Sequence, residues 1–192
     1  MSSESIERLV VFGAGPQAWR HVDAMCAIRA VNSVRIVGTG LARVENLVRY
    51  CRDVHGLDAA SAAPRAAADA DLVVCCTSSQ QPLFDGAILR DDAVVVAVGA
   101  HTTTARELDD TALKRSALVV VEARSAALRE AGDIVLAVNT DSCDPTKLVN
   151  LAELMKLDSI PQGVRTFKSV GMGWEDLAVA AAAYERASQD RT

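Results

Sequence analysis

The sequence predicts an α/β protein with a doubly wound, mostly parallel sheet and flanking helices. Two observations lead to this class: short runs rich in Val, Ile and Leu recur along the chain, and helical apolar spacing separates several of them. The runs do not alternate polar with apolar residues, which is typical of strands covered on both faces. They occupy residues 9–12, 34–37, 72–76, 93–98, 118–121 and 134–138.

The segments between the first runs show the spacing of amphipathic helices. Val22, Met25 and Cys26 fall on one helical face, and Leu47 and Cys51 recur four residues apart in the next segment. Strands that alternate with helices indicate right-handed crossovers. We therefore expect the strand order 3-2-1-4-5-6, with a ligand crevice at the carboxyl ends of the strands.

The end of the chain has a different character. Residues 139–145 are predicted to form a loop, after which we expect no further strands. Residues 174–187 predict an Ala-rich helix with Leu177, Ala181 and Tyr184 on one stripe. We divide the chain into a cofactor-binding domain, residues 1–150, and a C-terminal segment, residues 151–192.

Composition excludes several classes of protein. The net charge is −5 and no basic block is present, which argues against a nucleic-acid partner. The N-terminus lacks the features of a signal peptide, and the apolar run 93–100 is far below the ~18 residues of a membrane span. The five cysteines include no C-x-x-C pair, which favours buried thiols in a reducing cytoplasm over disulfides or a metal site.

The glycine-rich string at residues 13–18, GAGPQA, follows the first predicted strand and opens the first predicted helix. This context is typical of a Rossmann dinucleotide site. Gly13 permits the tight turn, Gly15 lets a pyrophosphate approach the backbone, and Ala18 lets helix and strand pack closely. The alternative is a strand-to-helix turn that binds no ligand.

The second predicted strand ends without the acidic residue that usually binds the ribose of NAD. Gly38, Thr39 and Gly40 stand there instead. Arg43 could meet the 2′-phosphate of NADP, with Thr39 supplying a hydroxyl, or Arg43 could be a solvated helix residue. The sequence therefore leaves the choice between NAD and NADP open.

Two later loops leave the carboxyl ends of predicted strands. The hydroxyls of Thr77 and Ser79 could bind ribose, or they could serve ordinary turn chemistry. His101, in the loop with Gly99 and Ala100, could relay a proton near the cofactor or simply be a loop residue. Residues 106–109, RELD, predict a helix start with a structural role.

Four ordered motifs resemble those of the ornithine cyclodeaminase/μ-crystallin family. They are GAGPQAWRH at 13–21, TSSQQP at 77–82, VGAHT at 98–102 with RELD at 106–109, and FKSVGMGWED at 167–176. The resemblance covers nearly the whole chain. It implies a cofactor domain of an NAD(P)-dependent reductase or dehydrogenase of small imino or amino acids, of the ketimine reductase, Δ1-pyrroline-2-carboxylate reductase or alanine dehydrogenase type.

The resemblance also implies site residues. His101 and Lys168 are the catalytic candidates, although Lys168 could equally be an exposed structural lysine. No metal ligand is expected. The candidate cofactor-binding residues are Gly13, Gly15, Pro16, Gln17, Ala18, Gly38, Thr39, Arg43, Thr77, Ser79, Gly99, Ala100, Val170 and Gly171.

Two departures from the family pattern shape the expected function. Cyclodeaminases carry an aspartate where this chain has His101. This departure counts against ornithine cyclodeaminase, which we keep as the alternative activity. The chain starts at the first Rossmann strand, so we expect the family's substrate domain to be absent and the terminal helix to lack its packing partner. On this basis the chain alone should have negligible turnover, and a non-catalytic nucleotide-binding module is a third possibility. A homodimer is possible.

Overall fold

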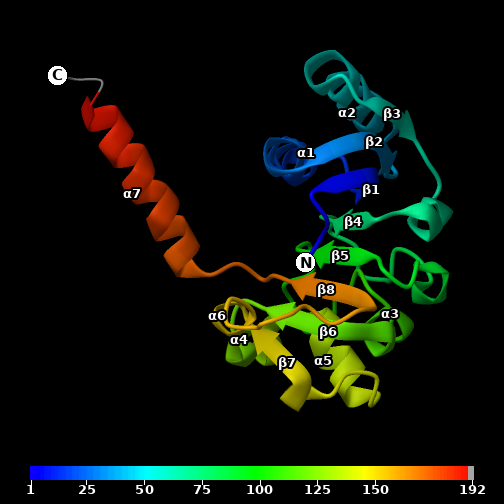
Figure 1. Ribbon diagram of the computed structural model, residues 1–192, viewed down its shortest axis with the longest axis vertical. Coiled ribbons are helices and arrows are strands. Elements are labelled where there is room, and N and C mark those ends of the chain that lie inside the picture. The colour runs from blue at the N-terminus through cyan, green and yellow to red at the C-terminus, as the bar shows by residue number, and fades with distance from the viewer. Residues whose placement is uncertain (190–192) are drawn as a thin grey trace.

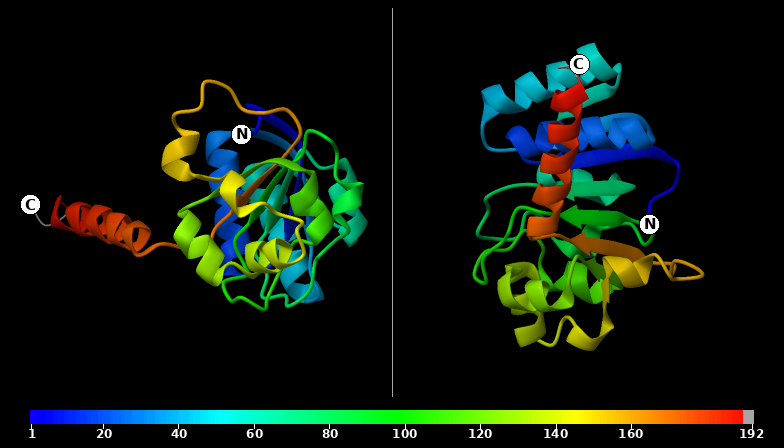
Figure 2. Two further views of the ribbon diagram at one scale, coloured as in Figure 1. Left: turned by 90° about the horizontal axis from the view of Figure 1, so that it is seen from below. Right: turned by 90° about the vertical axis from the view of Figure 1, so that its left-hand side faces the viewer.

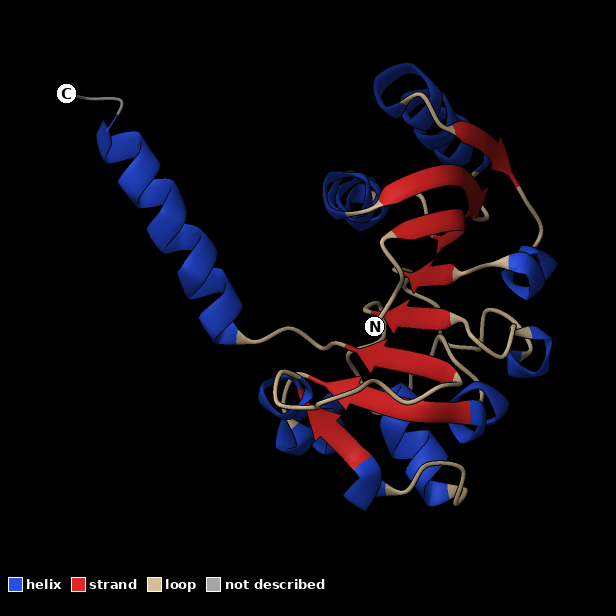
Figure 3. Ribbon diagram, viewed as in Figure 1, coloured by secondary structure: helices blue, strands red, loops and turns tan. Residues whose placement is uncertain are grey.

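One sheet of eight strands forms the centre of the molecule (Figures 1 and 3). The computed structural model describes residues 1–189. Every neighbouring pair of strands is parallel, which confirms the predicted fold class. The strands are β1 (Ser5–Phe12), β2 (Ala30–Val37), β3 (Asp58–Ser61), β4 (Leu72–Cys75), β5 (Val94–Ala97), β6 (Ser116–Val121), β7 (Leu148–Asn150) and β8 (Val164–Lys168).

The spatial order of the strands is β3-β2-β1-β4-β5-β8-β6-β7, which agrees with the predicted order 3-2-1-4-5-6 as far as β5 and departs from it where β8 lies between β5 and β6. The assignment of the apolar runs to these strands was wrong. The third predicted run became β4 and pairs with β1, whereas the order placed it outside the second run. The outer place belongs to β3, whose sequence DAAS carries no apolar run that could have revealed it. Successive strands are added on one side of β1 as far as β3 and on its other side from β4 onward, which makes the sheet doubly wound.

Helices cover both faces of the sheet. The longer helices are α1 (Pro16–Ile28) and α2 (Leu41–His55), and the shorter ones are α3 (Asp110–Arg115), α4 (Arg124–Glu130), α5 (Gly132–Asn139) and α6 (Leu151–Leu154). Short 3-10 turns at Pro64–Asp69, Gly86–Ile88 and Pro145–Lys147 complete the connections.

Alternate residues of β1 feed two separate cores. Leu9 and Val11 pack with α1 and α2 on one face, and Val10 and Phe12 pack with α3 and α5 on the other. This two-sided burial explains why the strand is continuously apolar. Each fully buried Val or Leu side chain contributes about 1.5–3 kcal/mol, so β1 is a strong anchor for the turn that follows it.

Residues 134–138, predicted as a strand, lie in helix α5 instead. A short apolar run cannot be assigned to a buried strand or a buried helix by periodicity alone. Here Ile134 and Ala137, three residues apart, face the core, and Asp133 before them is also fully buried. The tertiary surroundings therefore decided the conformation of this segment.

Two strands follow the loop at 139–145, where we expected none. β8 even lies inside the sheet, between β5 and β6. Its sequence VRTFK has no apolar run, and the buried positions include the polar Thr166 and Lys168. A lysine usually indicates an exposed position and not a central strand, so the sequence did not reveal β8. Residues 151–192, predicted as a separate segment, thus contribute a strand to the common sheet.

The last helix, α7 (Gly173–Gln189), extends away from the sheet (Figures 1 and 2). It matches the helix predicted at 174–187, and none of its described residues is buried. Leu177 is 69% exposed and Tyr184 is 75% exposed, so the predicted apolar stripe faces solvent. No helix in the described residues is long and apolar enough to cross a membrane.

Candidate functional site

A cleft of about 580 Å³ opens at the carboxyl ends of β1, β2 and β4. We call it the carboxyl-edge cleft. Arg43 is the one charged residue in its described lining. This position, beside the reversal of strand order, is where doubly wound sheets bind ligands. The lining residues are 12–15, 37–40, 43, 62, 64, 76–79 and 83.

The turn between β1 and α1 forms the floor of the cleft. Gly13 has a φ of +114°, and a Cβ there would stand 2.8 Å from the carbonyl oxygen of Cys76. Its amide donates to the Val37 carbonyl at 2.8 Å, which ties the turn to the end of β2. Only glycine fits this turn, because both the conformation and the close approach of two backbones exclude a side chain.

The start of α1 presents free backbone donors to the cleft. Gly15 is the N-cap, Pro16 occupies the first turn, and no acidic side chain caps the helix. The amides of Ala14 and Gly15 donate no hydrogen bond to any described residue. A Cβ on Gly15 would meet nothing within 4 Å, so the space above these amides is open. Free N–H groups at a helix N-terminus suit a phosphate.

Arg43 closes the cleft at the end of β2. Its guanidinium folds back over Gly40, where a Cβ would stand 3.0 Å from Nε and 3.2 Å from one terminal nitrogen. The guanidinium forms no hydrogen bond or ion pair with a described residue. An unpaired cation beside free backbone amides makes the cleft electropositive, which favours an anionic ligand.

The hydroxyls at the end of β4 are already used within the protein. Ser79 Oγ donates to the Gln81 carbonyl at 2.7 Å. Thr77 Oγ1 donates to Glu107 at 2.8 Å and accepts from the Ser79 amide at 3.2 Å. Contacts from these hydroxyls to a ribose stay a prediction, and they would have to use the remaining oxygen lone pairs.

Cys76 also lines the cleft, and its thiol donates to the Phe12 carbonyl at 3.2 Å. Burial, with a further effect of the Glu107 charge, raises the pKa of this thiol to about 12. The thiol is therefore neutral near pH 7 and is not a nucleophile.

The two catalytic candidates differ in exposure. His101 is exposed, and its Nδ1 lies 3.1 Å from the Gly99 carbonyl oxygen. Lys168 is only 1% exposed, so an exposed structural lysine is excluded. Its ammonium lies 3.2 Å from Asp133 Oδ2, and neither atom has another polar partner among the described residues. Neither residue lines the carboxyl-edge cleft.

The loop after β8 is held by an acidic residue that the sequence analysis did not single out. Glu122, which follows β6, accepts hydrogen bonds from the amides of Val170 at 2.9 Å and Gly171 at 3.2 Å. Ser169 Oγ donates to the same carboxylate at 2.5 Å. Val170 and Gly171 are predicted cofactor-binding residues, and their amides are thus occupied by Glu122.

Seven of the predicted cofactor-binding residues come together in the cleft lining and seven do not. Those in the lining are Gly13, Gly15, Gly38, Thr39, Arg43, Thr77 and Ser79. Ala18 is buried beneath the turn, and Pro16 and Gln17 are exposed at the start of α1. Gly99, Ala100, Val170 and Gly171 lie in neighbouring loops outside the lining.

Glu107 is the main residue that sequence reasoning missed. Its carboxylate is fully buried and receives hydrogen bonds from the loops after β4 and β5. Burial raises the pKa of this carboxyl, and the hydrogen bonds from Thr77 and Gly99 act in the opposite direction. The one available signal was its place in the RELD motif, which we interpreted as a helix start. That helix, α3, begins later, at Asp110, with Asp109 as its N-cap.

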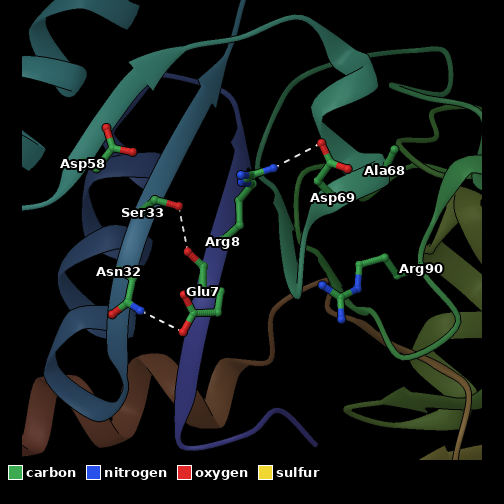
Figure 4. Close-up of a pocket in the computed structure, with 8 residues that line it drawn as sticks. All are labelled: Glu7, Arg8, Asn32, Ser33, Asp58, Ala68, Asp69 and Arg90. Atoms are coloured by element: carbon green, nitrogen blue, oxygen red, sulfur yellow. Dashed lines mark hydrogen bonds and ion pairs between the residues drawn. The ribbon is translucent and has the colours of Figure 1, made fainter.

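A second groove, of about 640 Å³, lies at the opposite edge of the sheet (Figure 4). Its charged groups already have partners in the protein, some within the lining and some beside it. Arg8 contacts Asp69 at 3.1 Å, Asn32 donates to Glu7 at 2.8 Å, and Arg90 contacts Asp71 at 2.9 Å. These internal pairs leave no chemistry directed at a ligand, so the carboxyl-edge cleft is the better candidate. No cluster of three metal-ligating side chains occurs within residues 1–189.

Comparison with known proteins shows the same relationship along the whole chain. The model of the ornithine cyclodeaminase/mu-crystallin family matches residues 1–191. Ketimine reductase mu-crystallin of Mus musculus is 30% identical over 178 residues, which are 92% of this chain and 54% of the mouse protein.

Solved structures agree with this result. A probable ornithine cyclodeaminase from Bordetella pertussis Tohama I superposes with a TM-score of 0.88 at 37% identity, covering 99% of this chain and 62% of that one. Thermococcus litoralis Delta(1)-pyrroline-2-carboxylate reductase, in complex with NADH and L-proline, gives 0.93 at 24% identity over 100% of this chain and 61% of that one, a likeness of fold. The chain thus spans less than two thirds of these relatives.

Proposed function

Because the chain belongs to the ornithine cyclodeaminase/mu-crystallin family, we propose that it binds NAD or NADP in the carboxyl-edge cleft. There it takes part in hydride transfer between the cofactor and a small imino or amino acid. The carrying observation is the pair of unsatisfied amides, Ala14 and Gly15, at the N-terminus of α1 in an electropositive cleft. When bound, the cofactor supplies the hydride chemistry, and the protein supplies orientation and electrostatics.

The lining residues divide the work of binding between them. The Ala14 and Gly15 amides bind the pyrophosphate, and Gln17 and Pro16 start the helix whose dipole favours that charge. Gly38 and Thr39 leave room for the adenosine ribose, and Arg43 neutralises a 2′-phosphate. Thr77 and Ser79 line the cleft at the end of β4.

The catalytic candidates act in different ways. His101, exposed in the loop after β5, exchanges a proton with the substrate nitrogen, because an imidazole can both accept and donate a proton. The burial of Lys168 and its ion pair with Asp133 support a positioning role rather than contact with substrate. The exposed stripe of α7 packs on a substrate domain, as the resemblance implies. The assembly is a homodimer, and the free thiols suit a reducing cytoplasm.

Ornithine cyclodeamination is the second candidate, and the likeness to the Bordetella protein favours it. His101 at the position of the cyclodeaminase aspartate argues against this reaction. The two activities separate on product: the lyase releases ammonia and proline from ornithine with no net change of cofactor, whereas the reductase consumes NADH or NADPH.

A charge introduced at Gly15 tests the binding site directly. The position has an ordinary φ of −85° and open space, so Gly15→Asp should fold normally while placing a carboxylate among the phosphate-binding amides. We expect titration with NADH and NADPH, followed by nucleotide fluorescence, to show binding by the natural sequence and roughly a hundredfold or greater loss in Gly15→Asp.

Ala24→Asp is the matched control. It adds the same charge to the exposed middle of α1, away from the cleft, and should bind as the natural sequence does. Failure of the folded natural chain to bind either nucleotide would sink the proposed site. Equal binding by Gly15→Asp would also do so.

A further inference from the structure

Two loops of the cleft edge meet on a single carboxylate. Glu107 Oε1 accepts from the Thr77 amide at 2.7 Å and from the Thr77 hydroxyl at 2.8 Å. Glu107 Oε2 accepts from the Gly99 amide at 2.7 Å. Thr77 follows β4 and Gly99 follows β5, so one side chain links the ends of two neighbouring strands. Its exposed fraction is 0%.

The segment that carries Glu107 is itself bound by a second buried carboxylate, that of Asp133. Asp133, at the start of α5, accepts from the amides of Glu107 at 2.7 Å and Leu108 at 2.8 Å through one oxygen. The other Asp133 oxygen pairs with Lys168 of β8. All three ionisable side chains are at most 1% exposed. A buried charge is tolerated only when it is paired or hydrogen-bonded, as each of these is.

Steric contact makes the arrangement tight. A Cβ on Gly99 would stand 2.0 Å from the Thr77 carbonyl oxygen and 2.5 Å from Glu107 Oε1. The two loops therefore touch backbone to backbone, with the carboxylate between their amides. Because the two backbones are in contact and their amides bind the same carboxylate, Glu107 determines the distance between the loops.

We propose that Glu107 is a positioning residue that holds the 77–79 loop and the 99–101 loop at the separation the nicotinamide half of the cofactor requires. This inference rests on the proposed function. Glu107 lies outside the cleft lining, so it acts through Thr77 and Gly99 and touches neither cofactor nor substrate. Asp133 and Lys168 are its support.

The requirement is for a carboxylate and not merely for a polar group. Three donors converge on Glu107, and an ionised carboxylate accepts all of them. A glutamine offers one acceptor oxygen, and its NH₂ group would face a donor of Thr77 or Gly99. At least one buried N–H would lose its partner, which weakens the link between the loops.

Glu107→Gln separates this role from general stabilisation. The probes are NADH, NADPH and ADP, because ADP contains the adenine, ribose and pyrophosphate but no nicotinamide. We expect the variant to bind the dinucleotides roughly tenfold more weakly and ADP within about twofold of the natural sequence. The Gly13–Gly15 turn that holds the ADP part does not contact Glu107.

Asp109→Asn is the matched control. That carboxylate, two residues away, also accepts part-buried backbone hydrogen bonds, from Gly86 at 3.0 Å and Ala112 at 2.7 Å, but it holds α3 rather than the cleft loops. It should reduce thermal stability and leave the ratio of dinucleotide to ADP affinity unchanged.

Amide hydrogen exchange provides a readout without ligand. The Thr77 and Gly99 amides should exchange faster in Glu107→Gln than in the natural sequence or in Asp109→Asn. Should Glu107→Gln fail to fold, Thr77→Val removes the hydroxyl contact to Glu107, together with the one that the Ser79 amide makes, and leaves the Thr77 amide bond to Glu107 in place. The readout for this variant is exchange at the Gly99 and Thr77 amides, which should change in the same direction.

Unchanged exchange at both amides, or an equal loss of ADP and dinucleotide affinity, would overturn the positioning role. Absence of dinucleotide binding by the natural sequence would instead overturn the proposed function. Exchange would then still report whether Glu107 holds the loops.

Discussion

Polar groups around the cleft divide into those that the protein satisfies and those that it leaves open. The Thr77 and Ser79 hydroxyls and the Val170 and Gly171 amides are bonded internally. The Ala14 and Gly15 amides and the Arg43 guanidinium have no partner among the described residues. We therefore expect a ligand to bind chiefly at the β1 and β2 ends of the cleft.

The first prediction concerns Arg43 and the choice of cofactor. Arg43→Ala should weaken NADPH binding roughly tenfold and leave NADH binding within about twofold, because only NADPH carries a 2′-phosphate for a charge-assisted hydrogen bond. Fluorescence titration at low and high salt measures both affinities, and the NADPH difference should shrink as salt rises.

Arg49→Ala is the control for Arg43→Ala. Arg49 is also exposed on α2 but lies outside the lining of the carboxyl-edge cleft. An equal effect of Arg43→Ala on NADH and NADPH would mean that Arg43 does not contact the 2′-phosphate.

At the scale of elements, a single carboxylate links α1 to α2. Asp23 of α1 accepts from the Tyr50 hydroxyl at 2.7 Å and lies 3.0 Å from His55 Nε2, both on α2. The ring of Tyr50 also packs on Trp19, with centroids 4.6 Å apart. The Tyr50 hydrogen bond, followed by the contact with His55, lowers the pKa of the Asp23 carboxyl below its ordinary value of 3.8.

This shift predicts a pH dependence. A carboxyl group whose pKa is lower in the folded state stabilises the fold above its unfolded pKa, and the contribution disappears as pH falls through the folded pKa. Asp23→Asn should therefore be less stable than the natural sequence at neutral pH, and the difference should shrink as the pH falls below about 4. Thermal unfolding across this range measures it.

Asp53→Asn serves as the control for Asp23→Asn. The side chain of Asp53 is exposed on α2 and makes no ion pair or hydrogen bond with a described residue. Its replacement therefore changes the net charge alone. A difference for Asp23→Asn that stays constant from neutral to acid pH would contradict the linkage argument.

At the scale of the whole molecule, the carboxyl-edge cleft is formed, but its described lining holds no second charged group for a substrate carboxylate. Arg43 is the sole cation in the described cleft lining, and it lies at the β2 end rather than beside His101. The chain also spans only 54% of the mouse relative. Accurate positioning of substrate supplies several kcal/mol of the catalytic effect, and within residues 1–189 no second charged group lines the cleft to provide it.

We therefore expect negligible turnover by the 192-residue chain even where it binds cofactor. The measurement is NADH and NADPH consumption with Δ1-pyrroline-2-carboxylate, together with ammonia release from ornithine. Sustained turnover of either substrate by the purified chain would contradict this expectation and would mean that these residues complete a substrate site.

The sequence by itself determined the fold class, the glycine turn and the family. Continuous apolar runs and a glycine spacing are local patterns, and Gly13 and Gly15 stand where that spacing predicted. The tertiary structure decided the rest. It turned residues 134–138 into a helix, placed β8 within the sheet and buried Lys168 against Asp133. It also brought Glu107 between two loops. These outcomes depend on which side chains meet across long stretches of chain, and a buried charge leaves no periodic signal because its partners are distant in sequence.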